Sequence, residues 1–281
     1  MADSRHMTST THRHTAAVLG VLVLIGAACG DDEAASQART ETSSSAPAPT
    51  ETAALAEGTS VADPVIDPGD GGDYRAQLDA AETVDVVDNP YFPLPIGARW
   101  VYEGASDGEA ERIEVEVLDE TRRIMGIEAV VVRDRASING ELAEDTLDFF
   151  TQDRDGNVWY LGEETAEYED GEVTTTAGSF LAGVDGAQPG LIMLAEPAVG
   201  DAYRQEFYVG EAEDMGEVVA LGGTGTTPFG SFEDVLTTRD WTPLEPEVTE
   251  EKQYAPGVGA ISAETVDGGD AKIELVEFTR P

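Results

Sequence analysis

The residue types that most often carry enzyme chemistry are nearly absent from this sequence. Its three histidines, His6, His12 and His14, all precede its single cysteine, Cys29. If the chain is cleaved before Cys29, the remaining residues cannot build a Ser-His-Asp triad, a cysteine nucleophile or a zinc site of His and Cys ligands. Catalysis would then fall to carboxylates, hydroxyls, Arg or Lys. We therefore expect a protein that is not an enzyme.

Carboxylates, in contrast, are abundant. The 57 acidic residues outnumber the 16 basic ones and give a formal net charge of −41. Close acidic pairs arise by chance at this density, so a carboxylate-dependent hydrolase stays an alternative that no particular pair supports. The charge argues against nucleic acid as a partner, because phosphates would be repelled, and against direct contact with an anionic membrane surface.

One acidic segment has the ligand spacing of a calcium loop. Asp153, Asp155 and Asn157 alternate as in the first half of an EF-hand loop, but Val158 stands where that loop requires glycine. The alternative interpretation is a hairpin turn between two apolar runs, which Asp-Gly-Asn also suits. We favour the hairpin.

A second acidic segment contains Glu211, Glu213 and Asp214. It is a cation site, one end of an interaction surface or a solvated turn. No cofactor is expected other than calcium at one of these two segments.

The strand-like segment at residues 203–209 is unusual because polar residues occur on both of its faces. The period of two places Arg204, Glu206 and Tyr208 on one face. If that face points inward, Arg204 either pairs with Glu206 in a structural salt bridge or binds a carboxylate or phosphate of a ligand. These three residues are the candidate ligand-binding residues.

The elements that must position these residues are strands. Segments of alternating apolar and polar residues, such as residues 112–117, recur about every dozen residues, and no long segment has the helical period. We predict one all-β domain, an antiparallel meander of about ten to twelve strands that forms a curved sheet or open barrel. Pairs with the chemistry of tight turns separate the strands: Asp107-Gly108, Asn139-Gly140, Asp170-Gly171 and Gly222-Gly223.

Residues 182–201 interrupt this pattern with an apolar run, Leu191-Ile192-Met193-Leu194, among Gly and Pro. We favour a loop or short helix that plugs one end of the sheet. A lid over a ligand cavity is the alternative.

The N-terminal segment predicts export. Residues 16–28 form an apolar run of 13 residues after Arg13, too short for a membrane span of about 20 residues but suited to a signal peptide. The run ends in Gly26-Ala27-Ala28-Cys29, which resembles the lipobox of bacterial lipoproteins, with Gly26 in place of the usual leucine. The resemblance implies lipidation of Cys29. Ordinary signal-peptidase cleavage, which gives a secreted protein, is the alternative.

These patterns divide the chain into a signal peptide (1–28), a lipidated cysteine with a disordered acidic linker (29–83) and the β domain (84–281). The linker is rich in Ala, Ser, Thr, Pro and acids, a composition that cannot bury enough apolar surface to fold. We expect the protein on the extracytoplasmic face of the cell membrane, which it contacts through the lipid anchor.

The Pro-rich entry at residues 89–97, followed by Trp100 and Tyr102, resembles the start of many secreted bacterial β domains, some of them related to curved-sheet lipoprotein carriers. The resemblance implies a style of fold and no activity. The predicted function is a non-enzymatic module that binds an apolar or amphipathic ligand, or an envelope protein. A calcium-binding extracellular domain and a carboxylate-dependent hydrolase are the alternatives.

Overall fold

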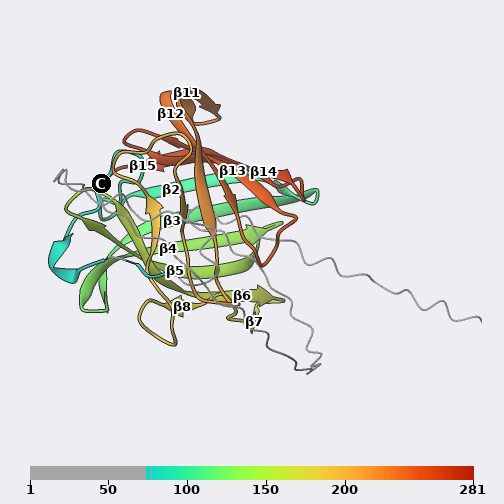
Figure 1. Cartoon of the computed structure of the whole chain (residues 1–281). Coiled ribbons are helices and arrows are strands. Elements are labelled where there is room, and N and C mark those ends of the chain that lie inside the picture. The colour runs from blue at the N-terminus through green and yellow to red at the C-terminus, as the bar shows by residue number, and fades with distance from the viewer. Residues whose placement is uncertain (1–73, 77) are drawn as a thin grey trace, which may run out of the picture.

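The computed structural model describes residues 74–76 and 78–281. The predicted signal peptide, Cys29 and nearly all of the predicted linker lie outside these residues. The described part is all-β and confirms the predicted fold class: its strands form one large antiparallel meander that curves without closing into a barrel (Figure 1). Among the described residues, no helix is long and apolar enough to cross a membrane.

The sheet has 15 strands, and apart from the short 3-10 helix η1 (Ala80–Glu82) the described elements are all strands. In chain order they are β1 (Thr83–Val84), β2 (Arg99–Ser106), β3 (Glu109–Ile124), β4 (Ile127–Ile138), β5 (Glu141–Asp153), β6 (Val158–Glu169), β7 (Glu172–Thr175), β8 (Phe180–Leu181), β9 (Gly190–Met193), β10 (Ala202–Arg204), β11 (Met215–Thr227), β12 (Gly230–Trp241), β13 (Thr249–Ala255), β14 (Gly259–Asp267) and β15 (Lys272–Thr279).

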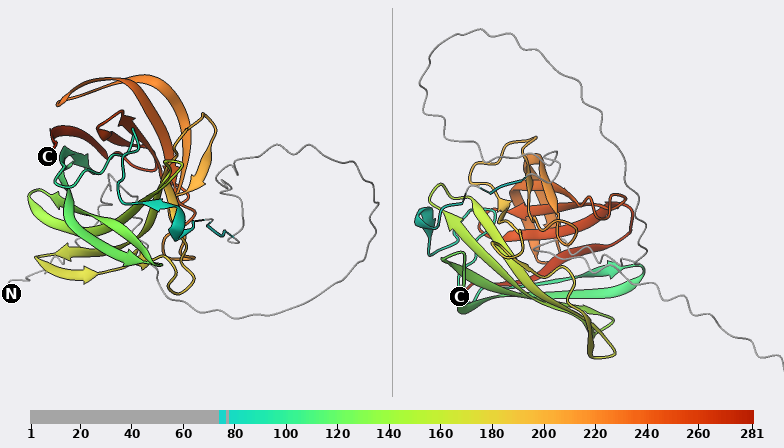
Figure 2. Two further views of the ribbon diagram at one scale, coloured as in Figure 1. Left: turned by 90° about the vertical axis from the view of Figure 1, so that its left-hand side faces the viewer. Right: turned by 60° about the horizontal axis from the view of Figure 1, so that its bottom comes forward.

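Two meanders joined side by side make up the sheet. Strands β2 to β7 follow one another in chain order, as do β10 to β15, and the pairing of β15 with β2 joins the two runs. The short strands attach at the sides: β1 pairs with β5, while β8 and β9 both pair with β6. Figure 2 shows how strongly the joined sheet bends. Side chains of both runs share the main core, among them Phe150 of β5, Tyr160 of β6, Leu236 of β12 and Tyr254 of β13.

The turns follow the backbone chemistry of their residues. Asp107-Gly108, Asn139-Gly140 and Asp170-Gly171 all have positive φ at both positions and connect strands as predicted. Met125-Gly126 adopts the same conformation between β3 and β4, but methionine gives no turn signal, so the sequence did not mark it. The predicted turn at Gly222-Gly223 is wrong. The pair lies inside β11, where the register with β12 shifts.

The apolar run at residues 191–194 is neither a helix nor a lid. Gly190–Met193 forms β9, and Leu191 through Leu194 are all buried in the main core. The run is therefore a buried strand of the main core, and the expected loop or short helix is wrong.

The main core covers the concave face of the sheet and includes Trp100, Val132 and Phe150. A smaller cluster lies on the opposite face of β4 to β6, around Phe149 and Leu161. Packing reaches ahead of the boundary expected at Val84, because Tyr74 is buried with its ring 5.3 Å from that of Phe207.

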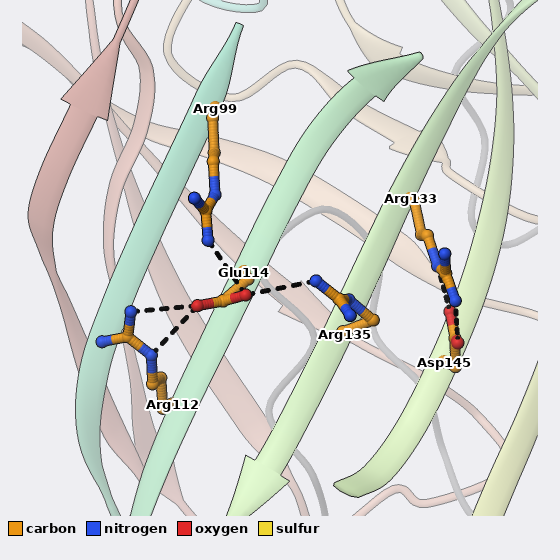
Figure 3. A network of polar contacts seen from close by, with 6 residues as sticks. All are labelled: Arg99, Arg112, Glu114, Arg133, Arg135 and Asp145. Atoms are coloured by element: carbon orange, nitrogen blue, oxygen red, sulfur yellow. Dashed lines mark hydrogen bonds and ion pairs between the residues drawn. The ribbon is translucent and has the colours of Figure 1, made fainter. Parts of the chain in front are cut away.

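The outer face of β2 to β5 carries an ion-pair network around Glu114 (Figure 3). Arg99, Arg112 and Arg135 each place a guanidinium nitrogen 3.0 to 3.2 Å from a Glu114 oxygen. Partial burial acts to raise the pKa of Glu114, but the three arginines together hold it below its usual value. Because the arginines are roughly half exposed, water screens these pairs and each contributes little to stability.

Candidate binding site

An open pocket of about 250 Å³ lies beside β6 and β8. Phe180, Leu181 and Val184 supply apolar walls, Tyr208 adds an aromatic one, and the buried Glu163 contributes a carboxyl group. Asp185 and Glu164 also line it. Apolar walls with a few placed polar groups are typical of small-molecule sites.

Gly162 brings the two strands of this pocket together. It sits in β6 opposite Leu181 of β8 at a φ of 121°, and a Cβ there would lie 2.2 Å from the carbonyl oxygen of Phe180. Only glycine allows so close a backbone approach. Gly178 in turn leaves room for the acid, because its own Cβ would lie 3.3 Å from Glu163 Oε1.

Glu163 is joined to a second buried acid by a tyrosine. Asp148 and Glu163 face each other across β5 and β6, and the Tyr160 hydroxyl lies 2.7 Å from Asp148 Oδ1 and 3.0 Å from Glu163 Oε2. A hydroxyl has one proton and can donate to only one of them. For both contacts to be hydrogen bonds, one carboxyl must be protonated and donate to the tyrosine oxygen.

Burial raises the pKa of both groups, and the neighbouring charge of Asp148 raises the pKa of Glu163 further. The site therefore favours the neutral form of Glu163 more strongly than an exposed position would.

Other acids surround this pair, and we call the set the buried acidic cluster. In every member burial is the main cause of a raised pKa. The cluster gathers residues from β5, β6 and the segment after β10: Glu144, Asp148, Glu163, Glu206 and Asp214.

The predicted ligand residues do not share a face. Strand β10 ends at Arg204, and the chain then turns so that the backbone N–H groups of Gln205 and Glu206 both donate to the Asp214 carbonyl. The predicted alternation is therefore wrong. Arg204 stacks over Phe207 at 4.7 Å and lies 3.8 Å from Glu213 Oε2.

The three residues have separate surroundings. Glu206 belongs to the buried acidic cluster, whereas Tyr208 lines the pocket. Arg204 does not line the pocket.

The segment around Asp153 forms the hairpin turn that we favoured. Asp153 Oδ1 accepts a hydrogen bond from the Asn157 backbone, and its Oδ2 accepts from Asn157 Nδ2 and Trp159 Nε1. Asp155 is exposed. The oxygens of Asp153 thus already stabilise the turn between β5 and β6.

The second acidic segment does not converge on one point. Glu213 Oε1 accepts a hydrogen bond from the Gly210 backbone, Glu211 is exposed and Asp214 is buried. Within residues 74–76 and 78–281, no group of three His, Cys, Asp or Glu side chains is arranged to hold a metal ion. Calcium binding stays a prediction.

A second space, beside Trp100 and Tyr102, measures about 20 Å³. It has room for roughly one water molecule, which needs about 10 to 15 Å³. This part of the concave face therefore has no room for an apolar ligand.

The sequence analysis missed Asp148, Tyr160 and Glu163. One signal was present: Asp148 has the same strand phase as the buried Thr146 and Phe150, so an acid occupies a core position of β5. No comparable signal marks Glu163, because the irregular pairing beside Gly162 shifts the phase of β6.

Comparison with known proteins gives distant similarities only. No family model and no curated protein matches the chain. A Bacteroides fragilis protein assigned as exported, with a YmcC-like fold, aligns at a TM-score of 0.42 and 16% identity over 68% of this chain and 99% of that one. A Parabacteroides distasonis protein assigned as a lipoprotein aligns at 0.39 and 13% over the same shares. With TM-scores below 0.5, neither similarity supports an inference about function.

Proposed function

We propose that this protein is an extracytoplasmic, lipid-anchored binding module whose pocket beside Glu163 takes a small amphipathic molecule. The observation that carries the proposal is the pocket itself: apolar walls from β8 and Val184 lie beside the carboxyl group of Glu163, whose pKa is raised by burial. The anchor is supported by the lipobox-like residues that end in Cys29.

The pocket limits the size and charge of its ligand. Its volume of about 250 Å³ is below the usual 300 to 1,000 Å³ of ligand sites, and a cavity of about 150 Å³ already accepts benzene. A single ring or short chain fits. Asp185 and Glu164 at the pocket repel anions, whereas Glu163 offers hydrogen bonds to a polar group. The favoured ligand carries a neutral or basic head.

Binding is better supported than hydrolysis. A carboxylate-dependent hydrolase needs two acids that both reach the substrate. Glu163 lines the pocket, but its partner Asp148 is fully buried behind it and bound to Tyr160. The other acids that line the pocket, Glu164 and Asp185, are exposed to solvent. The arrangement supports recognition of a ligand.

The test is an NMR titration of the full chain with benzylamine, benzyl alcohol and benzoate. We expect the amine and the alcohol to shift the methyl resonances of Leu181 and Val184 saturably, and the benzoate to leave them unchanged. Absence of any saturable shift with all three probes at millimolar concentration would overturn the proposal.

Two valines provide a matched pair of variants. Val184 and Val173 are 52% and 53% exposed, but only Val184 lines the pocket. We expect Val184→Trp to abolish the shifts and Val173→Trp to preserve them. Equal effects of the two substitutions would place the binding elsewhere.

A further inference from the structure

Lys252, one of only two lysines in the chain, lies in the interior. Its side chain is 1% exposed, and its Nζ is 3.3 Å from Oδ2 of Asp240, which is 0% exposed. The two residues project from neighbouring strands, β12 and β13, which pair Thr238 with Lys252 and Asp240 with Glu250. They are therefore diagonal neighbours on one face of the sheet.

The surroundings of this pair are unusual for an ion pair. Among the described residues, Asp240 Oδ1, Glu250 Oε2 and Asp214 Oδ2 are buried and have no hydrogen-bond partner. A buried ion pair repays the loss of hydration only when its remaining oxygens are also satisfied. Conversion of the pair to an amide would remove both buried charges.

We propose that Lys252 and Asp240 condense into an intramolecular isopeptide bond that joins β13 to β12. The lysine Nζ is the nucleophile and the Asp240 Cγ is the electrophile. Glu250, on the strand position opposite Asp240, is the acid that relays protons. Such a bond would stabilise a chain whose single cysteine rules out an intramolecular disulfide.

The reaction is balanced without an oxidant or a co-reactant. The nearby acids raise the pKa of Lys252 against the opposing effect of burial, so the first step is transfer of a proton from Nζ to the Asp240 carboxylate it contacts. The neutral amine then attacks Cγ. Glu250 protonates the departing hydroxyl and takes a proton from the attacking nitrogen. The Nζ–Cγ bond forms, a Cγ–O bond breaks and one water leaves.

The site supplies what this chemistry requires. Burial raises the pKa of Glu250 to about 8, so it is protonated and able to donate at neutral pH. Burial acts against the charged form of Lys252, while the nearby acids act in the opposite direction. Tyr203 and Tyr254, both fully buried, lie close enough for the Asp240 charge to raise their pKa values.

The other lysine is a natural control. Lys272 Nζ lies 3.2 Å from Glu264 Oε2, a similar distance, but the two side chains are 49% and 54% exposed. Water stabilises both charges there, so that pair is expected to remain ionic.

Tryptic peptide mass mapping of the unfolded full chain tests the proposal. Arg239 precedes Asp240, so cleavage after Arg239, Lys252 and Lys272 gives peptides 240–252 and 253–272 from an uncrosslinked chain. An amide at Lys252 blocks cleavage there. We expect one peptide, 240–272, lighter than its sequence mass by about 18 Da, one water. The two separate peptides at unmodified mass would overturn the proposal, and cleavage at Lys272 shows that digestion is complete.

The variant Glu250→Gln tests the proton relay, because it keeps the shape of the side chain and removes its acid. We expect the variant to yield the separate peptides 240–252 and 253–272 while retaining the β-sheet circular dichroism of the wild type. A full yield of cross-linked peptide would refute the role of Glu250. If the variant fails to fold, the wild-type mass still decides whether the bond exists.

Discussion

The Tyr160 side chain links two buried acids beside the pocket. Its hydroxyl contacts both Asp148 and Glu163, and its ring packs 4.9 Å from that of Phe150. One side chain thus contributes to the apolar core and to the polar contacts of the buried acids. Its loss would leave two carboxyl oxygens without their shared partner.

At the residue scale, we predict that Tyr160→Phe lowers the free energy of unfolding by about 2 to 4 kcal/mol, because buried groups that lose a partner each cost about 1 to 3 kcal/mol. Tyr102→Phe is the matched control, since the buried Tyr102 hydroxyl donates only to the Ala260 carbonyl. Urea denaturation should show the larger loss for Tyr160→Phe. An equal loss in both variants would argue against the shared proton.

Among the elements, β6 contributes Glu163 and Glu164 to the pocket, and it anchors the strand that supplies the apolar walls. It pairs with β5, β7, β8 and β9 along its length, and Gly162 is the point where β8 approaches it most closely. Among the described residues, the short strand β8 pairs with β6 alone, and Phe180 also packs 5.7 Å from the ring of Tyr160.

At the element scale, we predict that Gly162→Ala separates β8 from β6 and lowers the free energy of unfolding by more than about 2 kcal/mol, since it combines backbone strain with a steric clash. Gly171→Ala is the control: its φ is also positive, but an added Cβ meets nothing within 4 Å. It should cost about 1 kcal/mol. Thermal unfolding measures the stability of both variants. Similar losses of stability would mean that the fold does not depend on the close approach of β8 to β6 at Gly162.

For the whole molecule, the buried acids couple stability to pH. Burial raises the pKa of Glu144 and of Glu250 to about 8 in the folded protein, compared with about 4.3 for an unfolded glutamate. The folded state therefore binds more protons than the unfolded state between these values. Their contribution to stability is complete below about pH 4 and is lost as the pH rises through about 8. The many surface acids add repulsion in the same direction.

We predict that the free energy of unfolding decreases from about pH 5 to about pH 8, by up to ~1.4 kcal/mol for each unit of pKa difference at each group. Glu144→Gln should weaken this dependence, because the amide imitates the protonated acid, whereas Glu141→Gln at an exposed position should leave it unchanged. Urea denaturation at a series of pH values across this range measures the free energy of unfolding of each variant. A stability that rises toward pH 8 would contradict the prediction.

Local patterns were sufficient to predict the main strands. Alternation predicted a meander of about ten to twelve strands, where the described residues form 15, and Asx-Gly pairs predicted the turns from β2 to β3, from β4 to β5 and from β6 to β7. The prediction was wrong at two places. Gly222-Gly223 continues a strand where a turn was predicted, and β10 ends at Arg204 where a longer strand was predicted. Both depend on how neighbouring strands pair, which the local sequence does not contain.

The sequence by itself determined the all-β class, the meander and the scarcity of catalytic side chains, because these follow from residue type and from a period of two. Only the tertiary structure decided that Asp148 and Glu163 share Tyr160 and that Lys252 meets Asp240. The physical reason is burial. Each pair lies on neighbouring strands, β5 with β6 and β12 with β13, and only the packing of the folded sheet removes the water around these groups.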